Sequence, residues 1–508
     1  MLKNAGLSPA FLLPFWRDFL LKTGNCCFLW KNNNVMEQNQ LPLWQALQKH
    51  TAKKQAWLHV PGHGGGPGLP PEVRERLGSV ARYDLTELSG LDDLFAPREA
   101  IFQAQQLAAE LWQAEESFFL VNGSSAGVQA MLMATCGRGD IVLVPRNAHG
   151  SFYHGLILCG ATPRFLPVAE YKSVPLNITA DALQQGFANY PEAKAVFLTS
   201  PNYYGVCADM AGIYEVVRQH NALLLLDEAH GAHLGFHSGF PQNRGHLADL
   251  RVQSWHKTLG ALTPGAVLHR HGNGIDQERL RSSLQMVQTS SPPYPLLLSL
   301  DAARKQMALY GQQVAGEMLA QAQKLRRQLA DSLPLLTPGD VEGLGFSLDL
   351  TRLTVLTGEM GCCGRQAAAL LAGMGIDVEF GQPGHLLAIM GPGFCPPENV
   401  ELAEQIIATL DKCTPGKKVP PLPEPQQAMA PGEAFFAPAC FLTAAEAVGY
   451  ISAGTVVSYP PGVPLLAPGE VVTPDVASYI KDACAAGISF RGLDNAGRLR
   501  LVKQEVGR

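Results

Sequence analysis

Four short segments carry the side chains best suited to chemistry, and each follows an apolar run. The first is NGSSAG, Asn122–Gly127, in which Ser124 and Ser125 stand at the start of a predicted helix. Free backbone N–H groups, hydroxyls and the helix dipole at such a turn suit an anion such as phosphate. Taken alone, this pattern is more often an ordinary turn that caps a helix.

The second and third segments supply an acid and an amine. LLLLDEAHGAH places Asp227 as the first charged residue after a buried strand, at the sheet edge where open α/β folds bind ligands. QSWHKTLGALTPGA centres on Lys257, flanked by Trp255 and His256. A partly buried amine has a lowered pKa and becomes a nucleophile for carbonyls. The plainer alternatives are a helix-capping aspartate and a solvated lysine.

The fourth segment, RNAHGSFYHG, contributes His149 and His154 after another strand, although a single histidine here is more often structural. A metal site is a competing interpretation, because His230 and His233 follow an acidic pair. No H-E-x-x-H motif is present, and the glycine between the two histidines weakens helical presentation. We therefore predict no metal.

The order of these features indicates one cofactor. A phosphate-binding turn comes first, then a histidine, then an aspartate that ends a strand, and then a lysine 30 residues later. Pyridoxal 5'-phosphate (PLP) catalysis requires all four. The turn holds the phosphate, Lys257 forms a Schiff base with the aldehyde, and an aromatic ring lies over the pyridine. Asp227 keeps the pyridine nitrogen protonated, so that the ring accepts electrons.

The elements that position these residues are predicted from uninterrupted apolar runs. Such runs, without polar alternation, are typical of strands buried on both faces in a parallel sheet with helices on both sides. The runs are Phe118–Val121, Ile141–Val144, Ala195–Thr199 and Leu223–Leu226. Leu300–Leu329 is predicted to form one long amphipathic helix.

Five segments are expected along the 508 residues. They are a disordered leader or upstream-start extension at 1–35, an N-terminal segment with the cofactor-binding large domain at 36–300, a smaller α/β domain at 301–412, a Pro-rich linker at 413–433 and a C-terminal domain at 434–508. The linker is predicted from its proline content.

Composition excludes several classes of protein. The net charge is −5, so no strong basic excess points to binding of nucleic acid or an anionic membrane. The most apolar stretch, Ala5–Leu21, is interrupted by Pro14, Arg17 and Asp18, so no membrane span is predicted. The 11 cysteines include no C-x-x-C, which fits a reducing cytoplasm. The string DEAH within LLLLDEAHGAH also occurs in nucleic-acid motors. Such a motor needs a G-x-x-x-x-G-K-[ST] loop to bind phosphates, and this sequence has none, so that class is excluded.

Nine strings together resemble the Orn/Lys/Arg decarboxylase family, in its short form without a wing domain. They span Met36 to about residue 475 in the family's order: HVPGHGGG, DLTELSGLDDLFAP, FLVNGSSAG, PRNAHGS, TSPNYYGV, LLLDEAHGAH, VQSWHKTLGALT, TSSPPYPLLLSLD and SYPPGVPLLAPGE. One departure is Gly64, where many relatives carry lysine. The resemblance implies an aspartate-aminotransferase-type fold: a large domain with a mostly parallel seven-stranded sheet, a smaller α/β domain and a small C-terminal domain.

The resemblance also implies residue roles. Lys257 would be the Schiff-base lysine, Asp227 the partner of the pyridine nitrogen and His149 the ring stacked on the cofactor. The phosphate would be held by Ser124, Ser125, Ser254 and His256, and by Thr289 or Ser290 of a neighbouring subunit. Lys257 and His256 are candidate proton donors. For the distal cation of the substrate, the candidate carboxylates are Glu470, Asp92 and Asp93.

The implied reaction is decarboxylation of a basic L-amino acid, with arginine to agmatine plus CO₂ in polyamine biosynthesis favoured by the short form. A homodimer or higher homo-oligomer is expected, since the family's sites form between subunits. Lysine or ornithine as substrate, an aminotransferase or aldolase of the same fold, and a catalytically inactive regulatory homologue stay open. Aminotransferases of this type bind the substrate carboxylate with a small-domain arginine, and 340–412 shows no convincing equivalent.

Overall fold

The computed structural model describes residues 37–53, 56–272, 274–394, 399–413, 422–458, 462–486 and 488–504. The predicted leader at 1–35 lies outside these ranges. Among the helices described, none is both long enough and apolar enough to cross a membrane.

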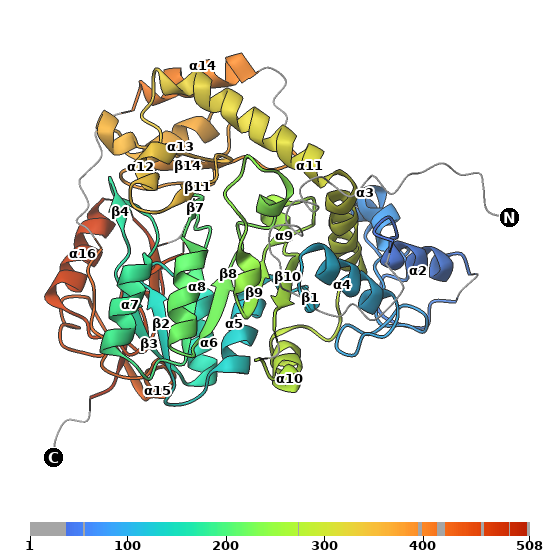
Figure 1. The fold of residues 1–508 in the computed structure, drawn as a ribbon, viewed down its shortest axis with the longest axis horizontal. Helices are drawn as coiled ribbons and strands as arrows, with labels where there is room; N and C mark the ends of the chain where they lie inside the picture. Colours follow the sequence, from blue (N-terminus) through green and yellow to red (C-terminus); the bar gives the residue numbers. More distant parts are fainter. Residues whose placement is uncertain are drawn as a thin grey trace. The chain divides into compact units, whose positions relative to one another are not determined.

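A seven-stranded sheet forms the centre of the large domain (Figure 1). Its strands, in spatial order, are β1 (Glu116–Leu120), β10 (Ala266–Arg270), β9 (Leu250–Gln253), β8 (Leu223–Asp227), β6 (Ala195–Thr199), β2 (Ile141–Pro145) and β3 (Thr162–Leu166). Only β10 is antiparallel to its neighbours. The predicted mostly parallel seven-stranded sheet is therefore confirmed.

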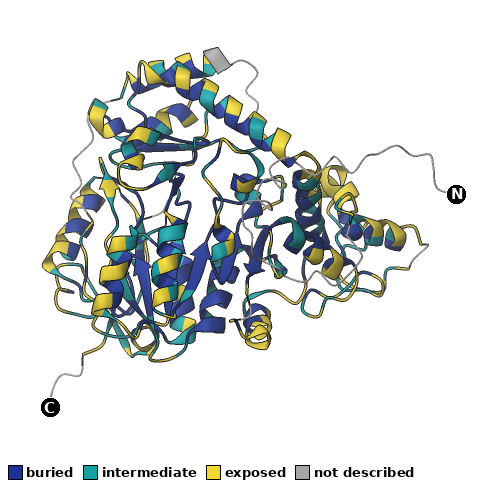
Figure 2. Cartoon of the chain, viewed as in Figure 1, coloured by how far each residue is buried: buried dark blue, intermediate teal, exposed yellow. Residues whose placement is uncertain are grey.

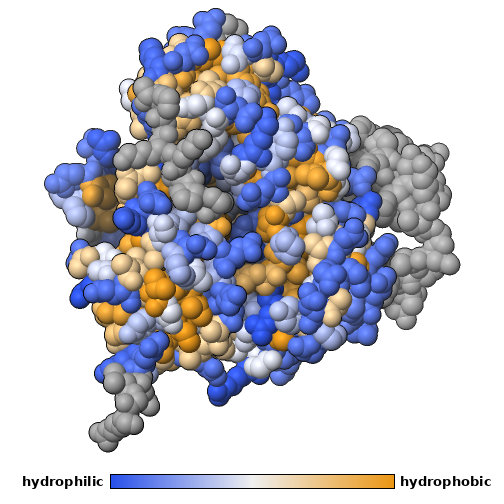
Figure 3. Space-filling view, turned by 90° about the vertical axis from the view of Figure 1, so that its left-hand side faces the viewer, coloured by the Kyte–Doolittle hydropathy of each residue, from blue (hydrophilic) through white to orange (hydrophobic). Residues whose placement is uncertain are grey.

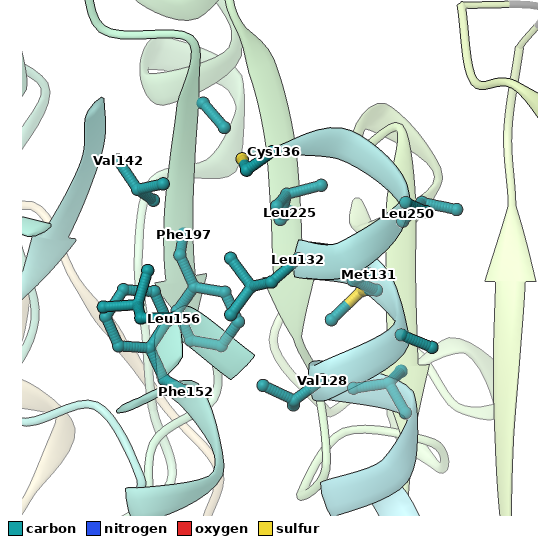
Figure 4. Packing of buried hydrophobic residues seen from close by; sticks show 14 of the residues in the cluster. Val128, Met131, Leu132, Cys136, Val142, Phe152, Leu156, Phe197, Leu225 and Leu250 are labelled. Carbon is teal, nitrogen blue, oxygen red and sulfur yellow. The ribbon is translucent and has the colours of Figure 1, made fainter. Parts of the chain in front are cut away.

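Helices cover both faces of this sheet, and the strand residues alternate between them. Phe197 and Leu225 face α5 (Gly123–Thr135), whose side chains interdigitate with α6 (Gly150–Cys159) in Figure 4. Val196 and Leu226 pack on the opposite face, in the apolar cluster that contains residues of α7 (Ala180–Asn189) and α8 (Met210–Gln219). Burial on both sides explains why these strands have no polar alternation, and Figure 2 shows them as buried.

The remaining elements of the large domain flank the sheet. They are α2 (Pro42–Thr51), α3 (Pro71–Ala81), α4 (Ala100–Leu111), α9 (Trp255–Thr258), α10 (Gln277–Val287), β4 (Glu170–Tyr171), β5 (Val174–Pro175) and β7 (Val206–Cys207). Side chains cap several helix starts: Thr179, Asp209 and Asp276 each accept a backbone N–H in the first turn of α7, α8 and α10.

The predicted long helix is present as α11 (Tyr294–Ala330). It begins six residues earlier than predicted, because Pro295 fits the first turn of a helix. Its contacts reach α2 and α4 of the large domain and α14 (Asn399–Leu410) of the small domain. The predicted domain boundary at residue 300 therefore falls inside one continuous helix.

The small domain contains a three-stranded antiparallel sheet in the order β12 (Arg352–Val355), β14 (Leu386–Ile389), β13 (Phe380–Gly381). Its other elements are α12 (Pro338–Glu342), β11 (Ser347–Leu348) and α13 (Gly364–Ala372). β11 pairs with β7 of the large domain. This pairing brings the small domain against the segment TSPNYYGV.

The C-terminal segment forms a separate apolar cluster. Its elements are α15 (Pro431–Phe436), β15 (Ala439–Leu442), β16 (Val456–Ser458), β17 (Pro464–Leu466), α16 (Pro474–Ala485), β18 (Phe490–Arg491) and β19 (Leu499–Val502). The Gly150 N–H donates to Gly462 O at 3.3 Å, and Ala467 joins the large-domain core. The described residues 462–470 of the motif SYPPGVPLLAPGE therefore lie beside PRNAHGS. The domain limits, including the linker at 413–433, stay predictions.

Candidate active site

Two helix starts meet at the predicted phosphate turn. Gly123 takes a left-handed φ of +77°, which glycine adopts without strain, and it lets the chain turn from β1 into α5. The Ser254 hydroxyl, just before α9, donates to the Ser124 hydroxyl at 2.7 Å. The Thr289 N–H donates to the Asn122 side chain of the same chain at 3.2 Å. Two of the predicted hydroxyls, those of Ser124 and Ser254, are thus brought together, and the backbone of Thr289 reaches the same turn. The phosphate-binding roles of these residues, and of Ser125 and Ser290, stay predictions.

Asp227 and Lys257 also meet at this edge of the sheet. Asp227 ends β8, and Lys257 lies in α9, directly after the neighbouring strand β9. Burial raises the pKa of Asp227, while the nearby Lys257 opposes that rise. Burial lowers the pKa of Lys257, and Asp227 opposes that change. The site therefore holds one buried carboxylate and one buried amine whose charged forms stabilise each other.

His230 and Tyr203 also lie beside Lys257, although the sequence predicted no role for either residue next to the lysine. The Lys257 Nζ lies 3.2 Å from His230 Nε2 and 5.6 Å from the Tyr203 ring centroid. Burial, with Lys257 nearby, lowers the pKa of His230 well below its usual value, so the ring is neutral and its Nε2 can accept a hydrogen bond from the lysine amine. Its position three residues after Asp227, on the same strand-end loop, is the sequence signal that could have identified it.

Two further histidines have defined tautomers. His149 caps α6: its Nδ1 accepts the Ser151 N–H at 3.2 Å, so the neutral ring carries its proton on Nε2. Burial, with Lys257 nearby, lowers the pKa of His149 to about 4. His256 Nδ1–H donates to Gly265 O at 3.0 Å, which leaves the lone pair on Nε2. Burial lowers the pKa of His256 as well.

These neutral histidines make the protein less stable in acid. Burial lowers the pKa of His385, 2.8 Å from Tyr204 Oη, to about 4, like that of His149. The unfolded chain protonates histidine near pH 6.5, so between about pH 6.5 and 4 it binds protons that the folded chain does not. The free energy of unfolding therefore falls as pH drops through this window. We expect melting temperatures to decrease by several degrees between about pH 7 and 5. His385→Gln should make this decrease in melting temperature smaller. If the melting temperature of the variant fell with pH as steeply as that of wild type, the contribution of His385 would be contradicted.

The side chains considered for metal binding have other partners. Glu228 lies 2.5 Å from Gln253 Nε2 and 3.4 Å from Arg251 Nη1. His233 Nε2 lies 3.0 Å from Asp349. Within the part of the chain described, no group of three or more histidine, cysteine and acidic residues is arranged to hold a metal ion.

Gln253 connects the two segments that carry the acid and the amine. It is fully buried, and its amide donates to Glu228, the residue after Asp227. Its carbonyl oxygen accepts the Trp255 indole N–H at 3.0 Å, two residues before Lys257. The side-chain amide therefore holds β8 and α9 in one arrangement.

Arg352 of the small domain also reaches this site. Its Nη2 donates to His230 O at 3.1 Å, and its Nη1 lies 2.9 Å from Thr351 Oγ1 and 3.5 Å from Asp349. The side chain is fully buried. The sequence did not single out this arginine as a carboxylate ligand, and the structure shows its guanidinium bonded to the loop that carries His230.

The three candidate substrate carboxylates already have protein partners. Both oxygens of Glu470 bind Arg146, one of them at 3.0 Å, and Ala467 N–H donates to the same carboxylate at 2.7 Å. Asp92 accepts N–H groups at the start of α4, at 2.8 and 2.9 Å. Asp93 accepts the Phe95 N–H at 2.7 Å. Their roles toward a substrate stay predictions.

The Arg146–Glu470 pair should contribute strongly to stability. The carboxylate is fully buried and the arginine is largely buried, so Glu470→Gln leaves an uncompensated buried charge. We expect the free energy of unfolding to fall by about 3–5 kcal/mol in chemical denaturation. Glu433→Gln breaks the exposed pair with Arg138 and should cost less than about 1 kcal/mol. Equal losses in the two variants would contradict this expectation.

The site fits PLP. Paired serine hydroxyls at two helix starts suit a phosphate, and a buried carboxylate and a buried amine lie at the same sheet edge. His230 Nδ1 is buried and has no hydrogen-bond partner among the described atoms, as expected where a polar group completes the site. Fold and site together define a PLP-dependent enzyme with the aspartate-aminotransferase-type fold.

Comparison with known proteins gives the family. Residues 41–342 match the model of the Orn/Lys/Arg decarboxylase major domain, and residues 421–497 match that of its C-terminal domain. The chain belongs to the Orn/Lys/Arg decarboxylase family and is a PLP-dependent decarboxylase of basic amino acids.

Relatives and solved structures agree with this assignment. The chain is 34% identical to an arginine decarboxylase of Bacillus subtilis (strain 168), over 92% of this chain and 99% of that protein. It is 33% identical to an arginine decarboxylase of Bacillus anthracis, over 92% and 98%. The structure of lysine decarboxylase LdcF from Francisella novicida aligns with a TM-score of 0.77 at 20% identity, covering 91% of this chain and 81% of that one. This last likeness supports the fold.

Proposed function

We propose that this enzyme converts L-arginine to agmatine and CO₂. The observation that supports it is the buried Lys257 amine beside Asp227 and the paired serine hydroxyls, in a chain similar along nearly its whole length to arginine decarboxylases. Agmatine is a precursor for polyamines, so a place in polyamine biosynthesis is part of the proposal.

PLP would be held by residues of three segments. Ser124, Ser125 and Ser254 would bind its phosphate, and His149 would stack on its ring. When bound, PLP supplies an aldehyde that joins amines and a ring that accepts the electron pair left when CO₂ departs. Asp227 would hold a proton at the ring nitrogen, because a buried carboxylate next to that atom favours its charged form.

The proton that replaces CO₂ must come from a side chain near the substrate Cα. Lys257 has a lowered pKa and a neutral histidine, His230, at 3.2 Å, so its amine gains and loses a proton readily. His256 is the second candidate donor, through Nε2, once that nitrogen is protonated. Burial of this region keeps water from competing for the proton.

A product screen tests the proposed substrate. Arginine, lysine and ornithine are offered separately to the PLP-loaded enzyme, and the amine and CO₂ formed are measured. Agmatine from arginine, at a kcat/KM at least about tenfold above the other two, is expected. Cadaverine or putrescine as main product would reassign the substrate. Amino-group exchange with a keto acid, without CO₂ release, would favour an aminotransferase, and no cofactor absorbance would indicate an inactive homologue.

We also propose a homodimer, supported by apolar surface on α3 and the segment before it. Val73, Leu77 and Val80 recur at helical spacing and are exposed, and Leu58 and Val60 are more exposed still. Exposed apolar stripes of this kind mark protein interfaces. Figure 3 shows a different side of the molecule, the left-hand side of Figure 1, where hydrophobic patches among charged residues are separate from this stripe on α3. Light scattering should give a dimer mass that Leu77→Glu lowers, and a fully active wild-type monomer would contradict this.

A cytoplasmic location completes the proposal. It is supported by the spread of cysteines along the sequence without a disulfide framework. Cell fractionation tests it directly.

A further inference from the structure

Two buried contacts from the small domain hold the loop that follows β8. The Arg352 guanidinium donates from Nη2 to His230 O at 3.1 Å. Three residues further along the loop, His233 Nε2–H donates to the Asp349 carboxylate at 3.0 Å. Arg352, Asp349 and His233 are all fully buried. The segment His230–His233 is therefore bonded to the small domain at both of its ends.

The two contacts belong to one polar network. The Thr351 hydroxyl donates to Asp349 at 2.7 Å and accepts an N–H of Arg352 at 2.9 Å. The Arg352 guanidinium also lies 3.5 Å from the Asp349 carboxylate. Burial alone would raise the pKa of Asp349, but the neighbouring His233 and Arg352 lower it overall. The carboxylate therefore stays ionised and keeps the guanidinium in place.

The large domain leaves space for this arginine. Gly205, in the segment TSPNYYGV, has a φ of +82°, and a Cβ at this position would lie 2.8 Å from Arg352 Cγ. The Gly205 carbonyl accepts the Asp349 N–H at 2.9 Å, close to the pairing of β11 with β7. The aliphatic part of Arg352 therefore passes a glycine on its way to the loop of His230.

His230 connects this network to Lys257. Its Nε2 lies 3.2 Å from the Lys257 Nζ, and its carbonyl oxygen is the acceptor for Arg352. A hydrogen bond weakens steeply as its angle and length depart from the optimum, so the imidazole has to be held in place to accept from the amine. A buried contact to the backbone of the same residue limits its movement. Arg352 thus restrains the residue that lies nearest to the reacting amine.

We propose that Arg352 is a positioning residue that aligns His230 with the Lys257 amine, so that packing of the small domain sets how fast this amine reacts. The neutral amine adds to the PLP aldehyde, and the aldehyde oxygen leaves as water, so no further reactant is needed. A displaced histidine would slow this reaction and the later proton transfer to the substrate. The inference rests on Lys257 as the lysine that binds PLP, and not on which basic amino acid is the substrate.

The test is a double-mutant cycle that combines Arg352→Gln with His230→Gln. One rate is Schiff-base formation, followed by its visible absorbance after PLP is added to the full chain. The other is kcat with the basic amino acid that the product screen identifies. Arg352→Gln should lower both rates about tenfold when His230 is present, and less than about twofold in the His230→Gln background. The KM should change less than about threefold.

The matched control is Arg304→Gln in the large domain. Arg304 is equally buried, pairs with Asp301 as Arg352 pairs with Asp349, and donates to a backbone carbonyl, that of Gln38, at 2.6 Å. Its replacement should lower the melting temperature and leave both rates unchanged. Where a glutamine variant does not fold, Arg352→Lys and Arg304→Lys, which keep the positive charge, are compared in the same cycle.

The role of Arg352 and the proposed function can fail separately. Equal losses in both backgrounds, equal losses in the Arg304 variant, or wild-type rates in Arg352→Gln would overturn the positioning role. A KM raised more than about tenfold with unchanged Schiff-base formation would also overturn it, since the arginine would then bind the substrate carboxylate. If arginine releases no CO₂ while Schiff-base formation shows the expected coupling, the proposed substrate is overturned and the positioning role stands.

Discussion

Lys257→Ala is expected to lower kcat by about 10⁴-fold or more and to end covalent attachment of PLP. Its amine lies 3.2 Å from a neutral histidine, and Asp227 stabilises its charged form, so the substitution removes an amine held in a specific position. Loss of a nucleophile that also moves a proton removes two contributions at once. Borohydride reduction followed by mass spectrometry should find the cofactor bound to wild type and absent from the variant.

The matched control is Lys194→Ala. Lys194 is an exposed lysine that pairs with Asp140 at 2.7 Å. It lies just before β6, at the opposite end of that strand from the edge where Lys257 and Asp227 meet. This variant should keep both turnover and covalent attachment. Turnover in Lys257→Ala comparable with wild type, or attachment at a different lysine, would show that Lys257 has been assigned wrongly.

The sheet could be predicted where local pattern determines the strand. Ala195–Thr199 was predicted with the bounds that β6 has, because its apolar run is buried on both faces. β10 was not predicted, because AVLHR includes two polar side chains. His269 and Arg270 are buried in the structure, where Ser117 and Glu115 are among the residues that bind them. Those partners lie more than 150 residues away, and no local pattern records them.

The same distinction applies to the site. Asp227, Lys257 and the serines follow strand ends, and parallel strands bring such positions to one edge. Residues contributed by the small domain depend instead on how two domains pack, so Arg352 could not be placed from sequence. The pair between Arg146 and Glu470, 324 residues apart, escaped prediction for the same reason.

Asp227→Asn should lower kcat by about 10³-fold. In the protein without cofactor, the substitution removes the cost of burying a carboxylate but also removes the charge that stabilises protonated Lys257, so the two effects on stability oppose each other. With PLP bound, the same change removes the negative charge that would hold a proton at the ring nitrogen. Removing one electrostatic group from a buried site typically lowers kcat by about 10²–10³-fold. Here the group would act directly on the ring nitrogen of PLP, so we expect an effect at the upper end.

Glu228→Gln is the control that separates charge at the cofactor from charge in the core. Side chains alternate across a strand, so Glu228 points away from Asp227 toward Arg251 and Gln253. Its replacement leaves Arg251 without a counter-ion and should lower the melting temperature, yet it should change kcat less than about tenfold. Denaturation curves and kcat together distinguish the two carboxylates. If Asp227→Asn retained wild-type kcat, or if Glu228→Gln caused the larger loss of turnover at full PLP occupancy, Asp227 would not be the residue that maintains the ring charge.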